Sequence, residues 1–316
     1  MKGPVDVVSA GNLVVDFVAG PIAGLPAWGT LVSLPNRLEP AIGGNGGIFA
    51  VAASNLGLRT AVVGKVGRDF FGDWLVERFG EYGVGTELVR RGAKGTSSTV
   101  AIVNPEGERA FLHYMGANAM LSASDMKDVP KCRWFHMSSV FLLPGLTVKG
   151  MEGALARAKK QGAVTSLDVA WDPTGRWELG DCLRNVDYFV PNLDEGRAIT
   201  GKKDVHEVGA ELRRMGARNV IIKMGHEGSF FTGDGCEAFS ARSFEVEAVD
   251  STGAGDVFDA ALAYAVLNGM ELKQAVMLAN AAGAMSVTAF GGTASAPTTE
   301  ELLRFIRSKK GVGARD

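Results

Sequence analysis

The chain contains little cysteine and little histidine. Its 316 residues include three widely separated cysteines and four scattered histidines: Cys132, Cys182, Cys236, His113, His136, His206 and His226. Such an odd, scattered set of cysteines predicts neither a disulfide framework nor a metal-binding motif, and it favours a reducing cytoplasm as the compartment. The histidines form no ligand cluster, so each is expected to be an ordinary surface or core residue.

The chain also lacks a strong charge bias and long hydrophobic runs. Its formal net charge is −2, which argues against a nucleic-acid partner, because such partners need a basic face. No stretch of about twenty uninterrupted apolar residues is present, so we expect no membrane span. Asp6 and Asp16 interrupt the apolar N-terminal segment, which therefore lacks the continuous apolar core of a signal peptide.

What the sequence does contain is a regular alternation of predicted strands and helices. This order predicts a mostly parallel sheet covered on both faces, in a single α/β domain over residues 1–316, since no linker or repeat interrupts it. The predicted strands are Val5–Ala10, Thr60–Gly64, Trp134–Ser138, Ala163–Asp168, Tyr188–Pro191, Asn219–Met224, Gly228–Thr232 and Ser243–Val249. The predicted helices are Ile48–Leu58, Asp69–Tyr82, Val148–Gln161, Leu193–Thr200, Val205–Met215, Asp256–Gly269, Glu271–Phe290 and Thr298–Ser308.

Three further strands do not fit that sheet. Leu13–Ala19, and a hairpin of Ser97–Val103 and Arg109–Tyr114 joined by the turn Asn104–Glu108, have few helices near them. We expect them to form a small accessory sheet over one edge of the core. Its free strand edges could pair two copies of the chain, so a homodimer through this sheet is a further expectation.

The ten residues Val249–Phe258, VDSTGAGDVF, carry the strongest chemical signal. A strand is predicted before them and a helix from Asp256, so the small residues Gly253, Ala254 and Gly255 lie where strand passes into helix. Amides at a helix start, together with the helix dipole, form an anion site. A carboxylate beside that site suits proton removal from an alcohol that attacks a phosphate. An ordinary turn with a helix-capping aspartate is the alternative.

Two other nucleotide motifs fit less well. The segment reads G-x-G-x-x-F, so Phe258 stands where a dinucleotide-binding fingerprint has its third glycine. This disfavours a nicotinamide-dependent oxidoreductase. The P-loop signature, G-x-x-x-x-G-K-[ST], does not occur in the sequence.

Five separate segments, in order, resemble the ribokinase-like (PfkB) carbohydrate kinases. VDSTGAGDVF resembles that family's C-terminal signature, and Gly43–Leu75 resembles its N-terminal signature, including G-x-V-G-x-D-x-F-G at Gly64–Gly72. The others are PNLDE (Pro191–Glu195), IIKMGHEGSF (Ile221–Phe230) and ANAAGAMSVTAFGGTASAP (Ala279–Pro297). The resemblance implies a three-layer α/β/α core, with a small β-sheet lid inserted from about residues 13–41 and 94–116, and an enzyme that uses ATP and Mg²⁺.

The resemblance also implies roles around the phosphates. Asp256 matches the catalytic base, and the amides of Gly253–Gly255 match the anion hole. Asn192 and Glu195 match the N-x-x-E motif, in which Glu helps to hold Mg²⁺, largely through water, and Asn approaches the phosphates. This pair has an alternative interpretation, because Asn followed by Glu three residues later is also a capping box.

On the nucleotide side, Lys223, Gly225 and Gly228 match the nucleotide-binding turn, and Asn280 matches a position near the purine and ribose. Many relatives have Thr or Ser in place of Lys223, whose side chain either reaches a phosphate or is solvated. Asn280 has the alternative of an ordinary surface helix residue.

On the sugar side, Asp16 matches the family aspartate that binds sugar hydroxyls. Gly43, Gly44 and Asn45 match the glycine turn at which backbone approaches a polyol closely. Arg109 lies on a strand of the expected lid and is assigned to the substrate, with an exposed hairpin charge as the alternative.

Four more positions match a loop that binds a monovalent cation in many relatives: Asp250, Thr252, Gly291 and Ser295. Whether K⁺ binds here stays open at this point, because carbonyl ligands leave no residue signature.

The sequence departs from the family pattern at two places. Ile48 stands where the family usually has an Asn that contacts sugar hydroxyls, and Asn45 is the candidate to compensate for that loss. DVAWD (Asp168–Asp172) lacks the Asn and Arg of the common D-x-N-x-R run. Asp172 in place of a basic residue favours a neutral acceptor, and Trp171 could stack on a sugar face or a base.

These observations favour an ATP-dependent kinase that phosphorylates a hydroxyl of a small sugar or polyol. A nucleoside kinase, favoured by Ile48 and Trp171, is one alternative. A non-catalytic sugar-binding relative is the other.

Overall fold

The centre of the molecule is a nine-stranded sheet, seen in a computed structural model that describes residues 4–105 and 109–312. The strand order is β13-β12-β11-β10-β9-β8-β1-β4-β5, parallel throughout except for β12 and β13 at one edge. The strands are β1 (Val7–Ala10), β4 (Thr60–Val66), β5 (Val89–Arg91), β8 (Trp134–Ser138), β9 (Val164–Asp168), β10 (Tyr188–Phe189), β11 (Asn219–Lys223), β12 (Ser229–Gly233) and β13 (Phe239–Ala241).

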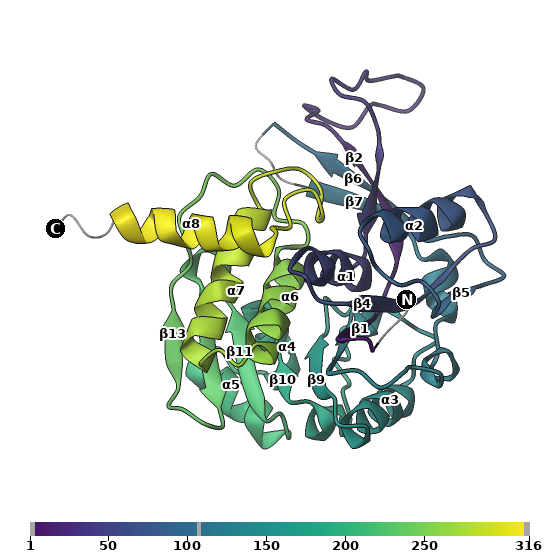
Figure 1. Ribbon diagram of the computed structural model, residues 1–316. Helices are drawn as coiled ribbons and strands as arrows, with labels where there is room; N and C mark the ends of the chain where they lie inside the picture. The colour runs from purple at the N-terminus through teal and green to yellow at the C-terminus, as the bar shows by residue number, and fades with distance from the viewer. Residues whose placement is uncertain (1–3, 106–108, 313–316) are drawn as a thin grey trace.

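Helices cover both faces of this sheet (Figure 1). One face packs against α1 (Asn45–Asn55), α6 (Ala254–Leu267), α7 (Leu272–Ser286) and α8 (Thr299–Val312), and the other against α3 (Val148–Lys160), α4 (Leu193–Thr200) and α5 (Val205–Arg214). Successive strand residues enter opposite cores, Val7 on the α6 side and Val8 on the α3 side. The predicted three-layer α/β/α core is therefore confirmed.

A second sheet of four strands forms the lid, in the order β3-β2-β6-β7. Its strands are β3 (Pro40–Gly43), β2 (Val14–Ala19), β6 (Ser98–Val103) and β7 (Arg109–Tyr114). Helix α2 (Phe70–Glu81) buries Leu75 and Phe79 against Leu13 and Val15, which ties the base of the lid to the core. The predicted accessory sheet is confirmed, although residues 106–108 of the predicted turn Asn104–Glu108 lie outside the described residues.

The lid carries unusual apolar exposure. Its edge strand β7 exposes Phe111, Leu112 and Tyr114, and the segment between β2 and β3 exposes Trp28 and Leu31. A soluble protein rarely leaves large apolar side chains gathered on a sheet edge without a partner.

One predicted strand is wrong. Residues Ser243–Val249 form no strand and pair with none in the described part of the chain, and β13 occupies the edge of the sheet instead. The amides of Val249 and Asp250 both donate to the carbonyl of Val287, the residue that caps the C-terminal end of α7. The alternating apolar residues that suggested a strand, Phe244 and Val246, line a cavity instead.

Short 3-10 turns complete the described structure at Gly116–Met120, Ala123–Met126, Val140–Leu142, Cys182–Asn185 and Gly225–Glu227. No helix among the described residues is long and apolar enough to cross a membrane.

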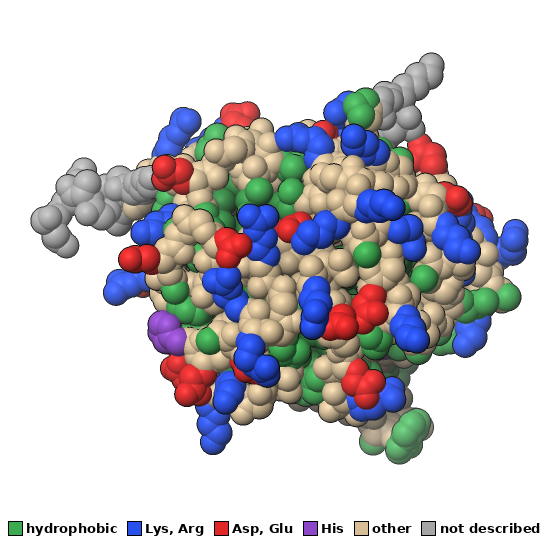
Figure 2. Space-filling view, turned by 90° about the horizontal axis from the view of Figure 1, so that it is seen from below, with side chains coloured by type: hydrophobic (Ala, Val, Ile, Leu, Met, Phe, Trp, Pro, Cys, Tyr) green, Lys and Arg blue, Asp and Glu red, His purple; other side chains and the backbone are tan. Residues whose placement is uncertain are grey.

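On the face shown in Figure 2, basic and acidic side chains are interspersed.

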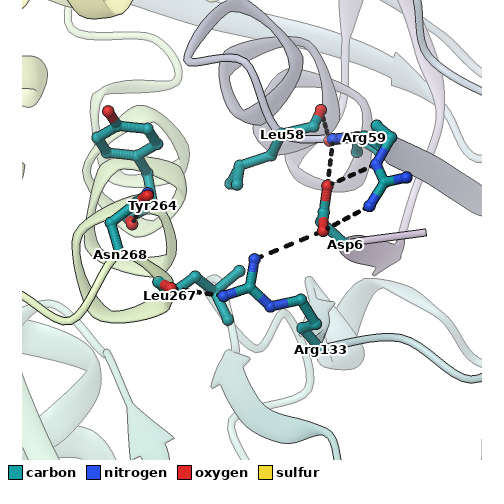
Figure 3. Close-up of polar contacts among 8 residues, drawn as sticks. Asp6, Leu58, Arg59, Arg133, Tyr264, Leu267 and Asn268 are labelled. Carbon is teal, nitrogen blue, oxygen red and sulfur yellow. Dashed lines mark hydrogen bonds and ion pairs between the residues drawn. The ribbon is translucent and has the colours of Figure 1, made fainter. Parts of the chain in front are cut away.

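Asp6, Arg59 and Arg133 form a charged network near the C-terminal end of α6 (Figure 3). The Asp6 carboxylate accepts from Arg59 Nε at 3.0 Å and lies 3.5 Å from Arg133 Nη1. Arg133 also donates to the carbonyl of Leu267, the last residue of α6, at 2.5 Å. A cation at a helix C-terminus is favourable, so this contact anchors the carbonyl end of α6.

Candidate active site

A cavity of about 730 Å³ opens at the carboxyl ends of the central parallel strands. Asp168 ends β9 and Lys223 ends β11, and both line it together with residues of α4, α6 and α7. This edge of an open α/β sheet is where such folds bind ligands. The cavity brings together eleven of the residues selected from the sequence: Asn45, Asn192, Glu195, Lys223, Gly225, Gly228, Gly253, Ala254, Gly255, Asp256 and Asn280.

The start of α6 faces this cavity. Gly253 caps the helix with φ +77°, and a Cβ there would lie 2.9 Å from the Ile48 side chain, so the position requires glycine. The first amides of a helix have no acceptor within the helix, and the dipole places positive charge there. The Ala254 amide is partly engaged, because it donates to the Ser251 carbonyl at 3.3 Å. The geometry is that of an anion site.

Asp256 lies in the first turn of α6 and is only 2% exposed. Its Oδ1 has no hydrogen-bond partner in the described structure. Burial raises the pKa of this carboxyl well above its usual range, and the nearby charge of Asp168 adds to the effect, whereas Lys223 and the Asn45 side chain oppose it. A buried carboxylate with an unused oxygen is suited to accept a proton from a bound alcohol.

Lys223 is neither solvated nor free to move. Its ammonium lies 2.8 Å from Asp168 Oδ2 and 3.5 Å from Asp259 Oδ1. Burial alone would lower its pKa, but the carboxylates of Asp168, Asp259 and Glu195 outweigh this and raise it. Neither Asp259 nor a role for Asp168 was predicted from the sequence. Two signals were available. Asp168 ends a predicted buried strand, and Asp259 follows Asp256 by about one turn of the same predicted helix.

The capping-box interpretation of Asn192 and Glu195 is confirmed. Asn192 Oδ1 accepts from the Glu195 amide, and Glu195 Oε2 accepts from the Asn192 amide, both at 2.8 Å. Burial raises the pKa of Glu195 to about 7, with the Asp168 charge as the second cause. Both residues also line the cavity.

Close approach at one position and a positive φ at the other explain the two glycines of the turn between β11 and β12. A Cβ on Gly228 would lie 2.0 Å from the Ala241 carbonyl oxygen, and Gly225 has φ +60°. Asn280 donates from Nδ2 to the carbonyls of Ala241 and Arg242, at 3.0 and 3.3 Å. The side-chain amide of Asn280 therefore links α7 to the segment at the end of β13.

On the lid side, Asp16 lies against Gly43. A Cβ on Gly43 would be 1.9 Å from Asp16 Oδ2, so only glycine leaves room for the carboxylate. Burial raises the pKa of Asp16 to about 6, and a hydrogen bond from Thr99 opposes the shift. Gly44 caps α1 with φ +78°. Among these lid-side residues only Asn45, whose Oδ1 accepts from Ser139, lines the cavity.

Of the four positions assigned to a cation loop, Asp250, Thr252 and Gly291 are joined by hydrogen bonds, and Ser295 bonds elsewhere. Asp250 accepts from the amides of Thr252 and Gly291, whereas Ser295 Oγ donates to the Ser286 carbonyl at 2.5 Å. The guanidinium of Arg109 also bonds to this loop, so it is not an exposed hairpin charge.

The departures from the family pattern have separate explanations. Ile48 does not line the cavity, because it is buried against Gly253 and Gly292 beneath the start of α6. Asp172 is 4% exposed and accepts from the amides of Thr174 and Trp177, which fixes its loop. Trp171 does line the cavity and is 59% exposed.

Comparison with known proteins shows the family of the chain. The sequence matches the model of the pfkB family carbohydrate kinases over residues 6–299. The chain belongs to this family. It is 28% identical to a protein named probable fructokinase-3 from Arabidopsis thaliana, covering 96% of this chain and 92% of that one. It is 25% identical to the 2-dehydro-3-deoxygluconokinase of Bacillus subtilis, covering 97% of each.

A solved structure supports the same assignment. An E. coli protein described as a ribokinase II, in complex with ATP and Mg²⁺, superposes with a TM-score of 0.84 at 26% identity, covering 96% of this chain and 99% of that one. The predicted family, fold and enzyme class are thus confirmed: the chain is a carbohydrate kinase of the sugar and nucleoside kinase group. These relatives act on different sugars, so they do not identify the acceptor.

Proposed function

We propose that this enzyme transfers the γ-phosphoryl group of ATP to a hydroxyl of a small neutral sugar or polyol. One observation carries the proposal. The buried Asp256 carboxyl, with Oδ1 unused, lies at the start of the helix whose amides face the cavity. A proton acceptor and an anion site therefore meet at one point, as transfer of a phosphoryl group to an alcohol requires.

In this mechanism Asp256 accepts the proton of the attacking hydroxyl. The new bond joins the acceptor oxygen to the γ-phosphorus, the bond to the bridging oxygen breaks, and ADP leaves. The amides of Gly253–Gly255 and the α6 dipole stabilise charge on the transferring group, and one such preorganised donor is typically worth about 3–4 kcal/mol. The ammonium of Lys223, close to Gly255, adds a fixed positive charge.

The nucleotide fits the part of the cavity between Gly225–Gly228 and α7. Phe244, Val287 and Asn280 line that part and supply an apolar surface beside one amide group. A base with polar edges and apolar faces suits such a lining. The assignments of Lys223, Gly225, Gly228 and Asn280 to ATP stay proposals.

Mg²⁺ fits the residues that remain. Glu195 uses Oε2 in its cap, which leaves Oε1 for a metal-bound water, with Asn192 beside it. Within the described residues no three His, Cys, Asp or Glu side chains form a metal-binding group. Mg²⁺ commonly binds through one or two carboxylates, several waters and the substrate phosphates, so a single carboxylate suffices. When bound, the metal would neutralise phosphate charge.

A neutral acceptor is supported by the charges around the cavity. Its only cationic or histidine lining residues, among those described, are Lys223 and His226, and Lys223 is already paired with carboxylates. Among the described lining residues, an acidic sugar would therefore find no lysine or arginine other than the paired Lys223. The exposed ring of Trp171 favours a nucleoside as the second candidate acceptor, because a base could stack on it.

The test is ADP release with Mg²⁺ATP across a panel of neutral sugars, polyols, acidic sugars and nucleosides. We expect turnover with a neutral sugar or polyol and little with its acidic counterpart. Preference for a nucleoside would establish the second candidate. Tight sugar binding by calorimetry without any turnover would indicate a non-catalytic binding protein and refute the proposed function.

A further inference from the structure

Arg109 connects the lid to the loop that precedes the anion site. It lies at the start of β7, and its guanidinium reaches the segment just before α6. Nη1 lies 2.6 Å from Asp250 Oδ1 and 2.5 Å from Thr252 Oγ1, and Nη2 donates to Ser251 Oγ at 3.1 Å. Its side chain is only 15% exposed. Three consecutive residues of the core are thus bound by one residue of the lid.

Both oxygens of the Asp250 carboxylate already have partners in the core or the lid. Oδ1 accepts from the Thr252 amide at 2.7 Å as well as from Arg109, and Oδ2 accepts from the Gly291 amide at 2.8 Å. The residue is 3% exposed. A buried carboxylate needs a positive charge nearby, and here the guanidinium provides it.

The same loop was expected to bind a monovalent cation, and the residues do not fit one. Asp250 Oδ1 is already paired with the guanidinium, Oδ2 accepts from the Gly291 amide, and the Ser295 hydroxyl donates to the carbonyl of Ser286. A cation at Asp250 would compete with the guanidinium for the same oxygen. Two positive charges at one buried carboxylate repel each other.

We propose that Arg109 replaces the monovalent cation of this loop and holds the anion site in position from the lid. This inference rests on the proposed function, and it makes Arg109 a positioning residue rather than a substrate contact. Thr252 immediately precedes Gly253, so displacement of the loop would displace the first amides of α6. The enzyme accordingly needs no K⁺ for activity.

The contact also links acceptor binding to the anion site. The lid carries both Asp16, on β2, and Arg109, on β7, within one sheet. The negative charge of Asp250 acts on Asp16, so the two carboxyl groups are close. An acceptor bound at Asp16 would therefore contact the same sheet that holds the guanidinium against Asp250.

Three measurements test the inference. Steady-state kinetics of the wild type, Arg109→Ala and Arg109→Lys are recorded in NaCl and in KCl at equal ionic strength. Thermal unfolding is recorded in the same salts without substrates. Rescue of Arg109→Ala by methylguanidinium is then measured. Arg37→Ala is the matched control, since Arg37 is an exposed lid arginine that pairs with Glu39.

We expect wild-type kcat and melting temperature to be the same in both salts. Arg109→Ala should lose about 10²-fold in kcat, as expected for a misplaced anion-site donor. KCl or methylguanidinium should restore at least a tenth of the lost rate, and KCl should raise the melting temperature of this variant only. Arg109→Lys should be intermediate, and Arg37→Ala should behave as the wild type.

The inference is overturned if K⁺ activates or stabilises the wild type strongly, or if Arg109→Ala keeps its kcat. A rise in acceptor KM alone would show that Arg109 contacts the substrate instead. If no acceptor is turned over, the proposed function fails, and the salt dependence of unfolding still decides the role of Arg109.

Discussion

The ammonium nitrogen of Lys223 lies 2.8 Å from Oδ2 of Asp168, and a Cβ placed on Gly255 would be 3.0 Å from the same nitrogen. One lysine thus lies beside the anion site and compensates a buried set of carboxyl groups. That set is Asp168, Glu195, Asp256 and Asp259, all at most 5% exposed. The positive charge at this point is fixed before any nucleotide arrives.

Lys223→Met should therefore damage both stability and rate. Removing one partner of a buried pair typically costs about 3–5 kcal/mol, and we expect a loss of that size at pH 8. The loss should shrink toward pH 5, where Glu195, whose pKa is raised to about 7, takes up a proton. Adding Asp259→Asn should recover part of the stability but none of the rate. Urea unfolding at both pH values checks this, and an unchanged stability at pH 8 would contradict it.

Asp256→Asn should abolish proton acceptance while leaving the fold intact. We expect kcat to fall by about 10²–10⁴, the usual range for a lost general base. Stability should not fall, because the replaced oxygen Oδ1 has no hydrogen-bond partner in the described structure. ADP release measures the rate, and calorimetry with ATP checks that nucleotide binding survives. A variant that keeps its turnover would refute the assigned base.

Stability should depend on pH through Glu195. Its pKa is raised to about 7 in the folded protein from an ordinary 4.5, so folding favours the protonated form. Its unfavourable contribution is absent below about pH 4.5 and grows as the pH rises to about 7. Glu195→Gln should therefore exceed the wild type in free energy of unfolding at pH 8 but match it at pH 4.5.

Glu301 provides a matched control with the opposite sign. It accepts from the Thr298 amide at 2.8 Å, and that hydrogen bond lowers its pKa. Glu301→Gln should lose stability relative to the wild type at pH 8 and not at low pH. If both variants shifted in the same direction, the buried position of Glu195 would not be the cause.

Gly43→Ala should impair acceptor binding. The added Cβ would lie 1.9 Å from Asp16 Oδ2, so the carboxylate must move. Overpacking of this kind costs about 1–3 kcal/mol, and we expect the acceptor KM to rise at least ~10-fold. Gly24→Ala, in the same lid with nothing within 4 Å, is the control. Initial rates at varied acceptor concentration measure the effect, and an equal KM in both variants would contradict the role of Asp16.

We propose that two copies of the chain pair through the lid. The edge strand β7 exposes 56% of Phe111 and 65% of Leu112, which a partner strand would cover. Leu112→Asp should convert a dimer into a monomer in sedimentation velocity. Phe70→Asp, at a 73% exposed position on α2, should not. A wild type that sediments as a monomer at micromolar concentration would refute the pairing.

The sequence predicted the site best where one backbone conformation is required. Gly253 at φ +77°, Gly228 against the Ala241 carbonyl and the cap of Asn192 on Glu195 each leave a local residue signature. The alternation of strands with helices likewise predicts the layers, because each strand must bury both faces.

Contacts between distant segments were not predictable in this way. The bonds of Arg109 to Asp250 and of Lys223 to Asp259 join residues far apart in the chain, and each side chain alone is compatible with a solvated charge. The strand predicted at Ser243–Val249 failed for a related reason. Apolar alternation cannot distinguish a strand that faces a core from a single segment that lines a ligand cavity.

The contact of Arg133 with the Leu267 carbonyl has a consequence for variants remote from the cavity. Helix α6 has 14 residues, so its two ends are separated by ~21 Å. Arg133 binds one end and the proposed anion site lies at the other, so we expect a substitution at Arg133 to change the orientation of the helix at the proposed site. Natural variants at Arg133 or Asp6 deserve kinetic as well as stability assays, because proximity to the substrate is a poor guide to their effect.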